Sequence, residues 1–204
     1  MIRKEKQTRS IQCDLKTRAE PNGESEEKII EGYFAVFNKE TELFPGGFEE
    51  IASNAFDKTL GNDIRALINH DTSLVLGRNK VGTLYLNIDT YGLYGRIKIN
   101  EKDTDAINLY ERVKRGDVDQ CSFGFFILDE STEYREDGSA KWTLNEVDLY
   151  EVSVCTFPAY EETGVTARSN EMSIYKEKQL LLRKNNLKER LKNGTKTTNT
   201  DKEN

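Results

Sequence analysis

The chain has 204 residues, which is enough for one domain of ordinary size with tails. Hydrophobic residues make up 36% of it and charged residues 32%, and no apolar run approaches the roughly 20 residues that a membrane helix needs, so we expect a soluble chain with a modest core. The charged N-terminus has no apolar stretch behind it, so we do not expect a secretory signal. The three cysteines (Cys13, Cys121, Cys155) have no CxxC spacing. We therefore expect a reducing compartment, no disulfide framework, no metal site and no cofactor.

The net charge of −6 is unevenly distributed. Residues 171–204 carry nine Lys/Arg and five Asp/Glu, a balance of +4, which leaves 21 basic and 31 acidic residues in the remainder, a balance of −10. Such a tail can bind nucleic acid or an acidic protein, or fold back on its own domain. The tail lacks interleaved aromatic and basic residues, so we do not expect nucleic-acid binding.

The first part of the chain reads as short extended segments. Residues 1–28 are polar and predict an N-terminal arm, either loosely held or forming an edge strand. Residues 29–37 (IIEGYFAVF) predict the first firm strand. A loop over 38–47 leads to a short extended piece, 48–51, and Ser53 or Asn54 is expected to cap a brief helix that ends at Leu60. Residues 63–69 predict a strand that ends at His70.

The rest of the chain alternates between strand and helix signals. Residues 82–89 and 93–99 form the clearest predicted hairpin. Asp103 or Thr104 is expected to cap a helix that Gly116 stops. Residues 118–128, 140–144 and 147–157 predict strands, 171–192 predict a helix, and 195–204 are polar enough for disorder. The pattern predicts an α+β fold, mainly an antiparallel β-barrel, closed or nearly closed, flanked by a few helices, with a main domain over 29–170 and a basic tail over 171–204.

His70 is the only histidine of the chain. It follows an apolar strand and precedes a polar stretch, a position where a side chain is rigidly held and still accessible. Its unperturbed pKa lets it accept and return a proton near neutral pH. The alternative is a structural or merely exposed histidine.

Ser122 lies in the apolar strand 118–128 and is the candidate nucleophile. Serine needs a neighbouring base, and His70 is the only histidine available. The alternatives are that Ser122 is small only to let the flanking phenylalanines pack, or that Cys121, on the other face of the strand, is the nucleophile.

An acidic side chain is expected to orient His70 as the third member of the site. Asp148 and Glu151 are three residues apart, so strand alternation puts them on opposite faces and only one can face His70. Glu151 lies in a stretch expected to be buried, where a carboxylate requires a partner, and we favour it. Asp71 adjoins His70, but adjacent side chains usually diverge.

Several segments, in order, resemble one protein family: 32–38 (GYFAVFN), 55–56 (AF), 69–71 (NHD), 76–78 (LGR), 82–84 (GTL), 89–93 (DTYGL), 122–125 (SFGF) and 151–159 (EVSVCTFPA). This set, spread over residues 29–168, is similar to the HK97-type prohead maturation proteases of tailed bacteriophages, which share a fold with herpesvirus assemblin. The resemblance implies that His70 is the general base and Ser122 the nucleophile. The third member is a histidine in the herpesvirus enzymes, and since this chain has no second histidine, the acidic position that Glu151 matches is expected to take its place.

The resemblance implies a serine endopeptidase that works inside the immature capsid in the host cytoplasm. Its substrates would be the scaffold protein or the scaffolding segment of the major capsid protein, and its own tails; a homo-oligomer is possible, and neither a membrane nor a cofactor is involved. Backbone amides near residues 123–124 or 76–78 would stabilise the oxyanion. We expect activity to rise through one ionisation near neutrality, adjusted by the nearby acid. Residues 171–192 would tether the protease to the scaffold. The alternatives are an inactive structural or scaffolding protein of the same barrel fold and a ligand-binding β-barrel.

Overall fold

The computed structural model describes residues 3–13, 15–22, 25–157 and 162–197. Its elements follow the chain as β1 (Arg3–Gln12), β2 (Lys16–Asn22), β3 (Ser25–Val36), β4 (Thr41–Phe44), β5 (Gly47–Ile51), β6 (Arg65–Ile68), β7 (Asp71–Arg78), the 3-10 turn η1 (Asn79–Val81), β8 (Leu84–Ile88), β9 (Gly92–Lys98), α1 (Thr104–Arg115), β10 (Gln120–Tyr134), β11 (Ala140–Cys155) and α2 (Glu162–Thr197).

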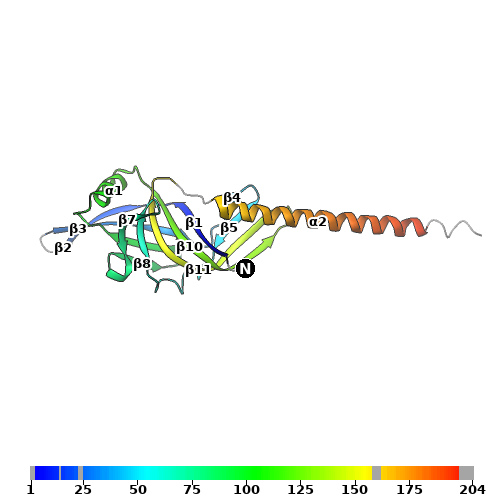
Figure 1. Cartoon of the computed structure of the whole chain (residues 1–204), viewed down its shortest axis with the longest axis horizontal. Helices are drawn as coiled ribbons and strands as arrows, with labels where there is room; N and C mark the ends of the chain where they lie inside the picture. Colours follow the sequence, from blue (N-terminus) through cyan, green and yellow to red (C-terminus); the bar gives the residue numbers. More distant parts are fainter. Residues whose placement is uncertain (1–2, 14, 23–24, 158–161, 198–204) are drawn as a thin grey trace, which may run out of the picture.

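The strands form two sheets (Figure 1). The larger sheet has seven strands and is centred on the long antiparallel pair β10–β11. Strand β1 lies antiparallel to β10 at one edge, whereas β5 and β6 run parallel to β11 on its other side. The smaller sheet has the order β2-β3-β9-β8. The polar segment expected to be an arm therefore contributes an edge strand to each sheet.

The hydrophobic core is shared by both sheets and α1. Alternate residues of β10 point into it, and its side chains come from every layer, among them Phe34 of β3, Ile97 of β9, Leu109 of α1 and Phe123 of β10, each no more than 2% exposed. Ser122 and Gly124 lie between the core-facing positions and so face the opposite side of the sheet.

The expectation of a closed or nearly closed barrel is wrong. Strand β7 pairs with β6 alone and β8 with β9 alone, so no hydrogen-bonded ladder joins the two sheets among the described strands. The turn through Gly82, which has a φ of 72°, directs the chain from β7 into the second sheet rather than back along the first. Closure requires one continuous ladder, and that ladder is interrupted here.

Strong local signals predicted their elements correctly. The hairpin is β8–β9, and α1 begins after Asp103, whose carboxylate accepts hydrogen bonds from the backbone N–H groups of Asp105 and Ala106. The helix expected at 53–60 is wrong: that segment forms successive turns. Strands β4 and β7 were not predicted, since neither shows a clear alternation of buried and exposed residues along its length.

Helix α2 begins earlier and extends further than predicted. It continues to Thr197, so residues 195–197 are helical rather than disordered, while residues 198–204 and the family-like residues 158–159 lie outside the described residues. Most of α2 projects away from the strands (Figure 1). Its first turns dock through the buried residues Arg168 and Met172. None of the described helices has a stretch apolar and long enough to cross a bilayer.

A disulfide joins Cys13 to Cys121, 108 residues apart, which corrects the expectation that these cysteines stay unpaired. The reason is the register of β1 on β10: Ile11 pairs with Cys121, which brings the residue at the end of β1 beside it. Sequence spacing alone does not reveal such a pairing. Cys155 is free and buried.

Candidate active site

His70 sits in a tight turn between β6 and β7. Ile68 pairs with Asp71, so Asn69 and His70 are the two central residues of a two-residue hairpin, with φ of 50° and 62°. Positive φ at both positions is what a type I′ turn requires, and it is uncommon for residues other than glycine. Asn69 holds the turn against β11, because its backbone N–H donates to the Val154 carbonyl and its Oδ1 accepts from the Thr156 N–H.

Glu151 is presented to this turn by a β-bulge. Gly124 pairs with Glu151 but Phe125 pairs with Leu149, so Tyr150 is the extra residue of β11. The bulge inverts the alternation: Val147 and Leu149 face the core before it, Val152 and Val154 after it. As a result Asp148 and Glu151 both lie on the side away from the core, and the expectation of opposite faces is wrong. Bulges often re-aim side chains in this way beside functional sites.

His70 and Glu151 form the centre of the site. The His70 Nδ1 lies 2.7 Å from the Glu151 Oε1, and the Glu151 side chain is only 3% exposed. Ser153 connects the two residues: its hydroxyl donates to the Glu151 Oε2 at 2.6 Å and accepts from the His70 backbone N–H at 3.2 Å. The ring is thereby oriented by its Nδ1, as in acid–histidine pairs, while its Nε2 is buried and has no hydrogen-bond partner among the described residues.

The surroundings favour the protonated form of His70. Burial lowers its pKa, but the Cys155 thiol and the Glu151 carboxylate outweigh burial and raise the pKa from 6.5 to about 10. An imidazolium is therefore the stable form of this arrangement at neutral pH. Glu151 supplies the negative charge that a histidine acting as a base needs beside it once it has taken up a proton.

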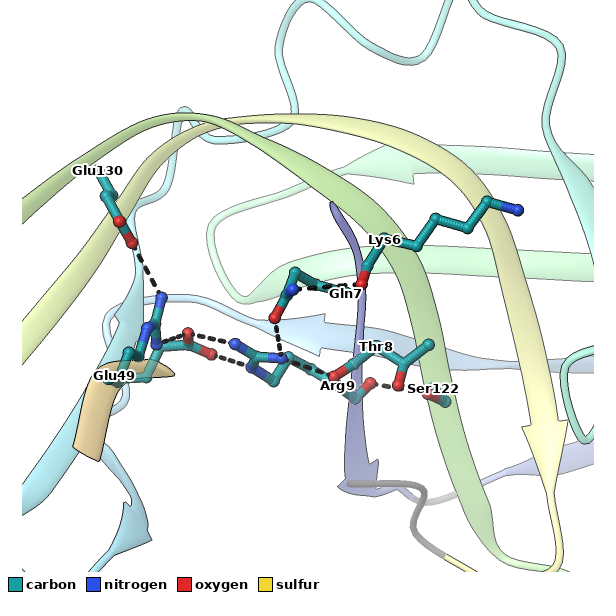
Figure 2. A network of polar contacts seen from close by, with 8 residues as sticks. Lys6, Gln7, Thr8, Arg9, Glu49, Ser122 and Glu130 are labelled. Carbon is teal, nitrogen blue, oxygen red and sulfur yellow. Dashed lines mark hydrogen bonds and ion pairs between the residues drawn. The ribbon is translucent and has the colours of Figure 1, made fainter. Parts of the chain in front are cut away.

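Ser122 lies one strand from this pair, on the same side of the sheet. It is opposite Ser153 in the β10–β11 register, and residues directly opposite in antiparallel strands share a face. Its side chain is completely buried, and its hydroxyl donates to the Arg9 carbonyl of β1 at 2.9 Å (Figure 2). The structure thus brings Ser122 next to the His70–Glu151 pair without a hydrogen bond between Ser122 and His70.

The other candidates lie elsewhere. Asp148 accepts from the Asn62 amide, and Asp71 accepts from the backbone and hydroxyl of Ser73. Cys121 is in the disulfide. Residues 76–78, one of the two places expected to supply oxyanion donors, are the end of strand β7. Within the described part of the chain, no three His, Cys, Asp or Glu side chains gather as a metal site would require.

Sequence reasoning missed three supporting residues: Ser153, Cys155 and Gly124. Glu151, Ser153 and Cys155 are every second residue of β11 after the bulge, so they lie on one face of the strand. This spacing could have predicted that Ser153 and Cys155 share the site with Glu151. Gly124 was recognisable only as part of the family-like segment. A Cβ at Gly124 would approach the Glu151 Oε1 to 2.2 Å, so glycine leaves the room in which this carboxylate lies.

The chain is similar to known phage proteins. The prohead protease of Enterobacteria phage HK97 is 30% identical over 150 residues, which cover 71% of this chain and 62% of that protein. Among solved structures, that of the bacteriophage T4 capsid assembly protease matches with a TM-score of 0.44 at 12% identity, covering 73% of this chain and 98% of that one. The profile of the caudovirus prohead serine proteases matches residues 13–178, most of the chain. This chain therefore belongs to the caudovirus prohead serine protease family.

Proposed function

We propose that this protein is a serine endopeptidase of prohead maturation. In the host cytoplasm, inside the prohead, it cleaves the scaffold protein or the scaffolding segment of the major capsid protein, and it cleaves itself. The observation that carries the proposal is the 2.7 Å contact between His70 and Glu151 with a buried serine on the adjoining strand. A protein that served only as a capsid-assembly scaffold would not need this arrangement.

In the proposed mechanism the Ser122 hydroxyl attacks the carbonyl carbon of the scissile peptide bond. His70 takes the hydroxyl proton at Nε2, for which the described residues supply no hydrogen-bond partner, and Glu151 stabilises the resulting imidazolium. His70 then gives the proton to the leaving amine, the peptide bond breaks, and water hydrolyses the serine ester by the same route. The neutral ring is the base, so the high pKa of His70 predicts that activity in this arrangement rises as pH increases toward 10 rather than levelling off near 6.5.

Strand β1 supports the proposal that the chain cleaves itself. It is an extended strand antiparallel to the strand of the nucleophile, which is how a peptide adds to the edge of a sheet. The carbonyl that contacts the Ser122 hydroxyl belongs to the bond between Arg9 and Ser10. We infer that this bond is the first one cleaved, and that departure of the segment ending at Arg9 opens part of the edge of β10 to other substrates, while the disulfide of Cys13 keeps the residues after the cut on β10.

The projecting part of α2 is the proposed tether to the scaffold. Its leucines Leu180, Leu181, Leu182 and Leu187 are each more than half exposed. Deletion of residues 177–204, which keeps the docked Arg168 and Met172, is expected to leave peptidase activity intact and to abolish packaging into proheads. Packaging at the wild-type level would refute the tether.

A fluorophosphonate probe tests the proposed activity directly, because an activated serine attacks its phosphorus, displaces fluoride and stays covalently labelled. We expect labelling of the wild-type chain that is lost in Ser122→Ala and His70→Ala and kept in Cys155→Ala. Cys155 is the matched control, since it is the other nucleophilic side chain beside His70. Labelling that persists in Ser122→Ala would refute the assignment of Ser122, and a folded wild-type chain that neither labels nor cleaves its capsid precursor would support the inactive scaffolding protein instead.

A further inference from the structure

Arg9 contacts the proposed nucleophile through its backbone and a buried carboxylate through its side chain. Its carbonyl oxygen accepts from the Ser122 hydroxyl, and its guanidinium forms two hydrogen bonds with Glu49 of β5, Nε to Oε1 at 2.6 Å and Nη2 to Oε2 at 2.9 Å (Figure 2). The residue whose carbonyl touches the nucleophile is therefore the residue whose side chain is held by Glu49. In a protease that residue precedes the scissile bond.

The Glu49 carboxylate is part of a buried network of charged side chains. Arg168 of α2, 1% exposed, bonds to Glu49 and also to Glu130 at 3.0 Å. Two guanidinium groups thus face two carboxylates. When Arg9 leaves with the cleaved segment, Glu49 loses the guanidinium that formed two hydrogen bonds with its carboxylate, and Arg168 remains shared between Glu49 and Glu130. A buried carboxylate in that state strongly favours the entry of a new cation.

The space for such a side chain is present. A cavity of about 230 Å³ lies beside β1 and is lined by Arg9, Glu49, Leu43 and Phe123, among others. Its apolar wall suits the methylene chain of a basic residue, and the carboxylate suits the head group.

We propose that Glu49 is the specificity-determining residue of this protease and selects arginine, and more weakly lysine, immediately before the scissile bond. The proposal rests on the proposed function, because it treats β1 as a strand bound in the manner of a substrate. Arginine is preferred because its planar fork matches both oxygens of the carboxylate, whereas lysine offers a single point charge.

Glu49 is ionised throughout the working range of pH. Burial raises its pKa, but Arg9 and Arg168 outweigh burial and lower the pKa from 4.5 to about 2. The carboxylate is therefore negatively charged while an arginine is bound to it as Arg9 is here.

The test compares quenched fluorescent peptides that copy residues 3–16, with arginine, lysine, leucine or glutamate at the position of Arg9, on the full-length chain. We expect kcat/KM for the arginine peptide to exceed that for the leucine peptide by about 10²–10³-fold, which is the effect of removing one partner of a buried charged pair. Glu49→Gln is expected to reduce this ratio to below about tenfold, and Glu50→Gln, the matched neighbour on β5 that faces Lys141, to leave it unchanged. The ratio of two peptides on one preparation does not depend on how much of a variant is folded.

The outcomes separate this inference from the function on which it rests. Equal cleavage of the arginine and leucine peptides by the wild-type chain overturns the role of Glu49 and leaves the protease intact, and so does a full arginine preference in Glu49→Gln. Fluorophosphonate labelling of Ser122 without cleavage of the arginine peptide also overturns the inference alone. A folded chain in which Ser122 is never labelled refutes the proposed function itself.

Discussion

Replacement of Arg168 by methionine tests whether the buried charge network holds the start of α2 on the sheet. Arg168 is 1% exposed, bonds to Glu49 and Glu130, and has its guanidinium carbon 5.3 Å from the centre of the Trp142 ring. Methionine preserves much of the packing on Trp142 but leaves two buried carboxylates facing one arginine. Breaking a buried ion pair in this way costs about 3–5 kcal/mol, a large fraction of the 5–15 kcal/mol by which a typical domain is stable.

The assay is urea unfolding of Arg168→Met, followed by fluorescence and by far-UV circular dichroism. Trp142 is the only tryptophan, so fluorescence reports on the network itself while dichroism reports on the whole fold. The exposed Arg183→Met on the same helix is the control and is expected to change the free energy of unfolding by less than about 0.5 kcal/mol. Adding Glu130→Gln to Arg168→Met removes one of the two carboxylates that Arg168 contacts and is expected to recover about 1–3 kcal/mol. A loss below about 1 kcal/mol in the single variant, or a double variant no more stable than the single one, refutes the reasoning.

Three further predictions concern the site and the disulfide. The single histidine gives unambiguous NMR signals, and its pKa is expected well above 6.5, near 10, and lower in Glu151→Gln; a wild-type value at or below 6.5 contradicts the geometry. Because the folded pKa is the higher one, the stabilisation from His70 is fully present below pH 6.5 and is lost as pH rises to about 10, so the stability difference from His70→Gln should narrow over that interval. Gly124→Ala is expected to displace the Glu151 carboxylate, to lower the His70 pKa and to reduce kcat by about 10²–10⁴-fold, and an unchanged pKa would show that the carboxylate stayed in place. Cys13→Ser opens a loop of 108 residues and is expected to lower the free energy of unfolding by up to about 4–5 kcal/mol by the chain-entropy estimate, measured under oxidising conditions; equal stability of variant and wild type would mean that the bond does not form.

Elements with local signals were the ones that sequence could predict. Helix α1 has an aspartate cap, an apolar stripe and a terminal glycine within 14 residues, and the β8–β9 hairpin combines alternation with a short turn. The failures are long-range. The open sheets, the disulfide and the docking of Arg168 depend on contacts between segments that are far apart in the chain, and no periodicity within one segment encodes such contacts.

The site shows the same division. The positions of His70 and Ser122 in apolar segments could be read from the sequence, but what surrounds them comes from two local departures from regular strand geometry. The positive φ at His70 fits a two-residue hairpin turn. An Asn-Gly pair is the usual sequence signal of such a turn, and an Asn-His pair does not predict it. This backbone conformation is held in place because Asn69 donates its backbone N–H to the Val154 carbonyl of β11 and accepts, at its side-chain Oδ1, from the N–H of Thr156 just after that strand.

The bulge at Tyr150 is the second departure, and it shows why alternation is unsafe beside a functional site. In a regular strand, two residues three positions apart lie on opposite faces. Asp148 and Glu151 were expected on opposite faces for that reason. The extra residue puts both on one face, so alternation does not distinguish them. What distinguishes them is depth along the strand: Glu151 lies opposite Gly124 and within reach of the His70 turn, whereas Asp148 lies at the level of Asn62. Gly124 is therefore as informative as either acid, because a glycine opposite a bulged carboxylate leaves the space in which that carboxylate can meet the histidine.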